Sequence, residues 1–147
     1  MIWAWSYESS AIGDAQAHLL DIMRVAEARN AAAGVSGILA FDRVGYYQIL
    51  EGSYLAVSGL RDSILRDRRH RVNWERLEPL SARRSPASLP MVVLPCEIPH
   101  GPITQPRNTA ALDAFEARLR NLAAETFPIS FAAAMAGGPA ALPEPLT

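Results

Sequence analysis

The sequence contains no lysine, because all 14 of its basic residues are arginine. This absence excludes a P-loop lysine, a Schiff-base lysine and a lysine general base, and with them several common kinds of enzyme. Cysteine is almost absent as well. Cys96 stands alone, which excludes an internal disulfide bond and any metal or redox site built on paired cysteines. With 15 acidic residues against 14 basic ones, the net charge of -1 gives no strong field, so no nucleic-acid partner is expected.

Proline is missing from the first half of this 147-residue chain, since all 11 prolines lie at or after Pro79. The N-terminal residues also lack the basic segment of a signal peptide, and Glu8 interrupts their apolar run. An uncharged stretch at 126–143 is rich in alanine and interrupted by glycine and proline, so it is a poor membrane-spanning helix. We therefore expect a cytoplasmic protein with one main domain and no membrane contact.

Hydrophobic periodicity predicts five short strands and two helices in the first two thirds of the chain. The strands are expected at residues 2–8, 35–41, 46–50, 72–77 and 91–94, and the helices at residues 14–30 and 54–67. Gly34 lies just beyond the first helix, where a glycine commonly ends one. The order βαββαββ predicts an α+β fold, a ferredoxin-like sandwich in which one mixed sheet carries both helices on the same face.

A third helix is expected at about residues 109–126. Its apolar side chains recur at a spacing of three and four residues and form a narrow stripe: Leu112, Phe115, Leu119 and Leu122. Such a stripe predicts that the helix packs either on the bare face of the sheet or on a partner. The expected organisation is a domain at 1–97, a C-terminal extension with this helix at 98–136, and a flexible tail at 137–147.

The chain offers little for classical catalysis, so we do not expect an enzyme. Its three histidines are far apart in the sequence, and no pair has the spacing of metal ligands. No serine lies in the turn motif of a hydrolase nucleophile, and Gly34 and Gly37 lack the pattern of a dinucleotide-binding loop. His70 lies in a basic run at 66–71 without aromatic residues, which is more typical of a solvated helix terminus than of a nucleic-acid surface.

Three polar side chains are predicted to enter the layer between the helices and the sheet. Gln48 lies in the middle of an apolar strand, and a buried amide without partners costs about 1–3 kcal/mol. Asn30 follows Ile22 and Ala26 on one helix face, and Tyr7 shares a strand face with two tryptophans. Together they predict a polar lining around a planar ligand rich in acceptors. The alternative is that each is an ordinary structural residue bonded to its neighbours.

Four short motifs follow one another within this region. They are YESSA at 7–11, NAAAGVSGIL at 30–39, YYQILEG at 46–52 and DRRH at 67–70. In order and spacing they resemble the motifs of the BLUF domains, bacterial blue-light sensors that bind a flavin. The resemblance covers residues 1–97 and implies the ferredoxin-like fold together with a noncovalently bound flavin, which is FAD or, alternatively, FMN.

The resemblance also implies roles for individual residues. Tyr7 matches the tyrosine that gives an electron and then a proton to the excited flavin. Gln48 matches the glutamine whose amide then rotates or tautomerises, so that a donor points at the ring carbonyl and the absorption shifts to the red. Met91 falls on the methionine of the last strand. Further residues match positions that bind the flavin: Ile22, Arg29, Asn30, Gln48, Ile64, Asp67 and His70.

The chain departs from the family at four positions. Leu89 stands where the family often has tryptophan, and Pro90 follows it. Pro86 replaces an aromatic residue, and Ser63 lies where a basic side chain commonly meets the flavin phosphate.

The leading interpretation is a photoreceptor that signals to a separate protein partner or through a homo-oligomer. One alternative is a ferredoxin-like interaction module that has lost flavin or photoactivity. Another, a small flavin oxidoreductase, lacks any visible nicotinamide site.

Overall fold

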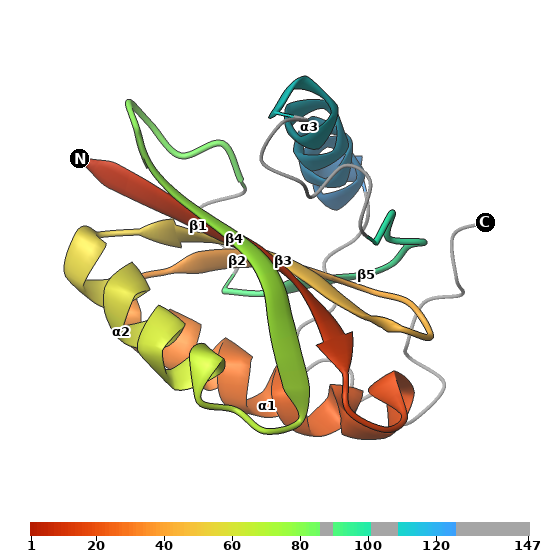
Figure 1. Ribbon diagram of the computed structural model, residues 1–147. Coiled ribbons are helices and arrows are strands. Elements are labelled where there is room, and N and C mark those ends of the chain that lie inside the picture. The colour runs from red at the N-terminus through yellow and green to blue at the C-terminus, as the bar shows by residue number, and fades with distance from the viewer. Residues whose placement is uncertain (86–89, 101–108, 126–147) are drawn as a thin grey trace.

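A five-stranded sheet lies between two layers of helices in the computed structural model, which describes residues 1–85, 90–100 and 109–125 (Figure 1). The strands are β1 (Ile2–Ala11), β2 (Ser36–Phe41), β3 (Gly45–Gly52), β4 (His70–Leu80) and β5 (Val92–Pro95). The helices are α1 (Ala15–Ala33), α2 (Tyr54–Leu65) and α3 (Thr109–Glu125).

The strand order across the sheet is β4-β1-β3-β2-β5, which places β3 at the centre. Neighbouring strands are antiparallel except for β2 and β5, which run parallel. The register of β1 and β3 sets Tyr7 directly opposite Gln48, and Glu8 opposite Tyr47. Because successive residues of a strand face opposite sides, the pair formed by Tyr7 and Gln48 lies on one face of the sheet and the other pair lies on the second face.

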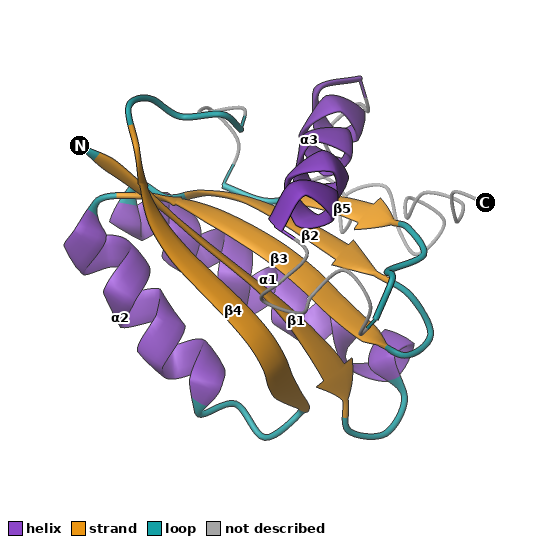
Figure 2. Ribbon diagram, turned by 45° about the horizontal axis from the view of Figure 1, so that its top comes forward, coloured by secondary structure: helices purple, strands orange, loops and turns teal. Residues whose placement is uncertain are grey.

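Different helices cover the two faces of the sheet (Figure 2). On the face of Gln48, each of two helices forms an apolar cluster with the strands. The cluster of α1 contains Met23, and the cluster of α2 contains Val57. On the opposite face, Leu119 of α3 is fully buried in a cluster that includes Ile49 of β3. The ferredoxin-like sandwich and the docking of a third helix on the bare face of the sheet are both confirmed.

Local signals in the sequence set the ends of two helices. The hydroxyl of Ser53 accepts a hydrogen bond from the backbone N–H of Ala56 at 3.2 Å and so caps the first turn of α2. Gly34 has a φ of 69° and ends α1, as its position predicts. A side chain at that residue would be strained by the left-handed backbone.

Several elements extend beyond their predicted ends. β1 continues to Ala11, and β4 includes Pro79, which the sheet accepts because β4 is an edge strand. α1 continues to Ala33, three residues past its predicted end. β5 begins at Val92, so Met91 lies directly before the strand and not within it.

Some of the positions discussed above fall outside the described residues, namely Pro86, Leu89, Thr126 and the expected tail at 137–147. Of the helices in the described ranges, none combines the length and the hydropathy that crossing a bilayer requires.

Candidate functional site

A small cavity lies between the helix layer and the sheet, lined by residues of both. Ile22 of α1 and Ile64 of α2 bring apolar side chains to it, whereas Tyr7 and Gln48 bring polar groups from the sheet. The predicted site residues that line the cavity are Tyr7, Ile22, Arg29, Gln48, Ile64, Asp67 and His70. Such walls suit a flat ligand with apolar faces and a polar edge.

The buried pair of Tyr7 and Gln48 forms the sheet side of this cavity. The Tyr7 hydroxyl donates a hydrogen bond of 2.5 Å to Oε1 of Gln48. At the other end of the same amide, Nε2 of Gln48 lies 4.0 Å from the sulfur of Met91. The acceptor end of the amide is therefore directed at Tyr7 and the donor end at the segment that leads into β5.

The surroundings of Tyr7 keep its hydroxyl protonated. Its ring lies 4.6 Å from that of Trp5 and 5.7 Å from that of His70, measured between centroids. Burial raises the pKa of Tyr7 far above its ordinary value, and the nearby carboxylate of Asp67 raises it further. The hydroxyl is thus a hydrogen-bond donor at any physiological pH.

Asn30 is buried in the last turns of α1 and does not line the cavity. Its Nδ2 donates to the carbonyl oxygen of Pro90 at 2.7 Å, in the segment that leads into β5. Gly37 leaves room for this contact, because a Cβ there would lie 2.9 Å from Nδ2 of Asn30 and 3.2 Å from that carbonyl oxygen. Met91, which follows Pro90, also lies outside the set of cavity-lining residues. Asn30 therefore contacts Pro90, and the next residue, Met91, contacts Gln48, although neither Asn30 nor Met91 lines the cavity.

Charged groups form part of the lining of the cavity. Arg69 donates to both carboxylate oxygens of Asp67, and these hydrogen bonds lower the pKa of Asp67 to about 2. Nε of Arg29 is buried and has no hydrogen-bond partner among the described residues. A buried donor without a partner is costly, so Arg29 fits a ligand that brings an acceptor, as the carbonyl edge of a flavin does.

His70, which lines the cavity, joins three elements. One ring nitrogen lies 2.8 Å from Oγ of Ser9, and the other lies 3.0 Å from the carbonyl oxygen of Ile64. Both nitrogens are therefore engaged by the protein. His70 holds the start of β4 against β1 and against the end of α2.

The cavity has four further lining residues that were not predicted: Val25, Ala26, Tyr46 and Arg69. The helical spacing from Ile22 could have found Val25 and Ala26, and strand alternation from Gln48 could have found Tyr46. Tyr46 donates to the carbonyl oxygen of Ala15 at 2.6 Å, and burial raises its pKa to about 12.

The cavity, its two helices and the buried tyrosine–glutamine pair define a ligand-binding domain of the ferredoxin-like class. Residues 2–86 match the family model described as "Sensors of blue-light using FAD". The chain belongs to this family, the BLUF domains, which are flavin-binding sensors of blue light. A comparison with curated proteins gave no match.

Solved structures with a similar fold include other BLUF proteins. Klebsiella pneumoniae BlrP1 with FMN and cyclic diGMP is 31% identical with a TM-score of 0.57, over 64% of this chain and 26% of BlrP1. This chain therefore spans about a quarter of BlrP1. The BLUF protein BlrB in its dark state is 27% identical with a TM-score of 0.56, over 84% of this chain and 86% of BlrB. The ground state of BlsA, at 20% identity and a TM-score of 0.62 over 89% and 93% of the two chains, supports the fold alone.

Proposed function

We propose that this chain senses blue light with a flavin held between α1 and α2, and that Tyr7 and Gln48 are its photoactive pair. The observation that carries the proposal is the 2.5 Å hydrogen bond from the Tyr7 hydroxyl to Gln48 at the wall of the cavity. A phenol and an invertible amide in contact are the two groups that a hydrogen-bond switch needs.

The chain's own residues would bind and orient the flavin from several sides. Ile22 and Ile64 would contact the two faces of the ring, and Arg29 would donate to its carbonyl edge. Asn30 would donate to the same edge with the second hydrogen of Nδ2, since the first is bonded to Pro90. Asp67 and His70, which both line the cavity, would lie near the ribityl chain. The burial of Tyr7 and Gln48 would exclude water from the reacting atoms.

A bound flavin supplies the absorption of blue light and accepts the electron. Tyr7 would give that electron and then its hydroxyl proton to the flavin, the proton leaving along the hydrogen bond to Oε1 of Gln48, and both would return to Tyr7 on recombination. The Gln48 amide would then rotate or tautomerise, so that its donor end faces the ring carbonyl. Met91 lies 4.0 Å from Nε2 of Gln48 and would register the change at the start of β5.

FAD is the flavin we propose, because the family description names FAD. FMN remains the alternative, since the BlrP1 structure contains FMN and Ser63 offers no positive charge to a phosphate. We further propose that the signal passes to a separate protein partner or through a homo-oligomer.

An absorption spectrum before and after blue light tests the proposal. The purified chain, incubated with FAD, should be yellow, and its flavin bands should move reversibly to longer wavelength on illumination. A chain that cannot be loaded with FAD or FMN would contradict the proposal and favour an interaction module without flavin. That module would bind its partner equally in light and in darkness.

A further inference from the structure

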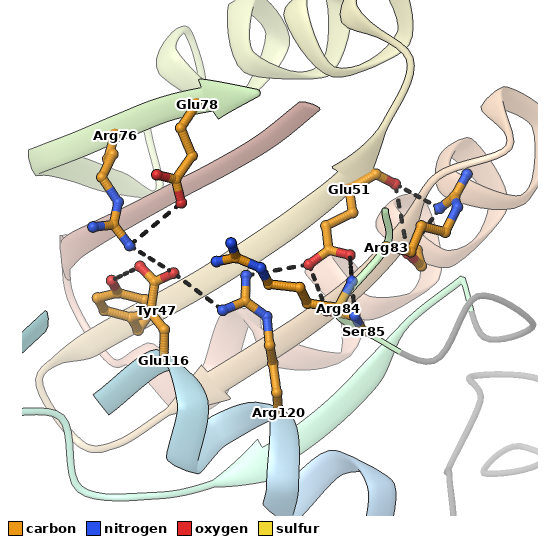
Figure 3. Close-up of polar contacts among 10 residues, drawn as sticks. Tyr47, Glu51, Arg76, Glu78, Arg83, Arg84, Ser85, Glu116 and Arg120 are labelled. Atoms are coloured by element: carbon orange, nitrogen blue, oxygen red, sulfur yellow. Dashed lines mark hydrogen bonds and ion pairs between the residues drawn. The ribbon is translucent and has the colours of Figure 1, made fainter. Parts of the chain in front are cut away.

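Glu116 is a carboxylate buried between α3 and the sheet, with 1% of its surface exposed. Its Oε2 accepts a hydrogen bond of 2.5 Å from the hydroxyl of Tyr47, and its Oε1 lies 3.1 Å from a guanidinium nitrogen of Arg76 (Figure 3). A second guanidinium nitrogen, from Arg120, lies 3.7 Å from the same oxygen. The carboxylate of α3 thus joins β3 to β4.

Arg120 extends these contacts along β3. One of its nitrogens lies 3.2 Å from Oε2 of Glu51, a fully buried carboxylate (Figure 3). Glu51 also accepts hydrogen bonds from the backbone N–H groups of Arg84 and Ser85, at 2.8 and 3.0 Å. We call Tyr47, Glu51, Arg76, Glu116 and Arg120 the α3 network.

Tyr47 meets α3 in two ways. Besides its hydrogen bond to Glu116, its ring packs edge-on against that of Phe115, with 5.0 Å between the ring centroids. Burial and the Glu116 carboxylate both raise the pKa of Tyr47, so its hydroxyl remains a donor. A movement of Tyr47 therefore acts on both a buried hydrogen bond and a ring contact.

Gln48 lies between the two points at which the α3 network holds β3. Tyr47 precedes it directly, and Glu51 follows three residues later. The side chains of Tyr47 and Glu51 face α3, whereas Gln48 faces the cavity on the other side of the sheet. Because the strand is paired on both edges, its backbone at Gln48 is fixed relative to these two side chains.

We propose that Glu116 is a positioning residue of the photosensor: through Tyr47 it holds β3, and with it Gln48, in the arrangement in which Tyr7 donates to Gln48. This inference rests on the proposed function of the Tyr7 and Gln48 pair. It assigns a role in the light reaction to α3, which lies beyond the residues 2–86 that match the family. The α3 network occurs in the same structure as the hydrogen bond from Tyr7 to Gln48. As a stabiliser of this arrangement, the network speeds the return to it after light, so its loss slows that return.

The first test measures how fast the red-shifted spectrum of the FAD-loaded full chain decays in darkness. Glu116→Gln keeps the size of the side chain but removes its charge, and Tyr47→Phe removes only the hydroxyl. We expect both variants to decay about fivefold more slowly than the unaltered chain, the lower end of a usual coupling between two sites. Asp113→Asn is the matched control. Asp113 lies on α3 and, like Glu116, forms an ion pair with Arg76 of β4, but its side chain is 59% exposed. Its decay should change less than about twofold.

Decay of the red-shifted state of Tyr47→Phe at the rate of the unaltered chain would overturn the inference. This variant decides the matter alone if Glu116→Gln does not fold.

The second test compares amide hydrogen exchange of α3 in darkness and under continuous light. We expect faster exchange in light for the unaltered chain and no difference in Tyr47→Phe. Equal exchange in light and darkness for the unaltered chain, together with a normal red shift, would contradict the inference and leave the proposed function intact. Absence of any red shift would contradict the proposed function itself.

Discussion

Tyr7 and Gln48 lie opposite each other on the antiparallel strands β1 and β3, and the Tyr7 hydroxyl donates to the Gln48 side chain at 2.5 Å. The pairing of the strands thus sets the geometry of the proposed photoactive pair. A one-residue slip of either strand would direct one of the two side chains to the opposite face of the sheet.

Replacing either member of this pair should separate flavin binding from the light response. Tyr7→Phe removes the hydroxyl, and Gln48→Leu removes the amide, while the walls at Ile22 and Ile64 remain. We expect both variants to bind FAD with an affinity within about tenfold of the unaltered chain, because only one polar contact is lost. Neither should show the red shift. A normal photocycle in either variant, followed by absorption spectroscopy, would remove the assigned roles.

Adding a methyl group at Gly37 should disturb the placement of Asn30. A Cβ at this residue would lie 2.9 Å from Nδ2 of Asn30, so the amide or the Pro90 carbonyl must move. We expect Gly37→Ala to weaken FAD binding about tenfold, the equivalent of one hydrogen bond.

Gly59→Ala provides the matched control, because Gly59 lies in α2 and a Cβ there would meet no atom within 4 Å. Alanine is the better helix former, so this variant should raise the free energy of unfolding by about 0.5–1 kcal/mol and leave FAD binding unchanged. Equal FAD affinity of the two alanine variants, measured by fluorescence titration, would show that Gly37 does not position Asn30.

The ion pair of Asp67 and Arg69 should make the stability of the domain depend on acidic pH. Its carboxyl has a pKa of about 2 in the folded chain, below the ordinary value of 3.8. A lowered pKa stabilises the fold fully above the ordinary value, and the contribution disappears as the pH falls from about 4 towards about 2. After allowance for solvent screening, we expect this pair to contribute about 1 kcal/mol to the free energy of unfolding. Urea unfolding measures this at about pH 6 and about pH 3. Between these two pH values, the free energy of unfolding should fall less for Asp67→Asn than for the unaltered chain. Equal losses would contradict the prediction.

Truncating Leu119 should show how strongly α3 is bound to the sheet. This side chain has no exposed surface, so Leu119→Ala should lower the free energy of unfolding by about 3 kcal/mol. Leu122 is only partly buried at the same cluster, and Leu122→Ala should cost clearly less. Similar urea midpoints for the two variants would mean that α3 leaves the sheet before the domain unfolds.

Strand alternation in the sequence predicts the two faces of β3, because Tyr46 and Gln48 repeat with a period of two among apolar residues. The same alternation assigns Tyr47 and Glu51 to the other face but says nothing of their partners. Glu116 shares a helix face with Leu112, yet a carboxylate beside an apolar stripe is ordinarily solvated. Its burial depends on Tyr47, which is 69 residues away in the sequence, so no local pattern could predict it.

The start of β5 also escaped the sequence pattern. Apolar residues continue from Met91 into the strand, so periodicity alone cannot distinguish the residue before the ladder from the first residue within it. The contact between Asn30 and Pro90 involves a backbone carbonyl oxygen, which every residue carries. The identity of the residue at position 90 therefore cannot predict this contact.

The alternation of β5 has a consequence for any motion at this edge of the sheet. Met91 and Val93 belong to the cluster under α1, whereas Val92 and Leu94 belong to the cluster under α3. Sliding β5 along β2 by one residue would exchange the two sets, taking Met91 away from Gln48 and Leu94 away from α3 in a single step. A one-residue slide of β5 would therefore change its contacts with both helix layers at once, whereas undocking of α3 would change only one set.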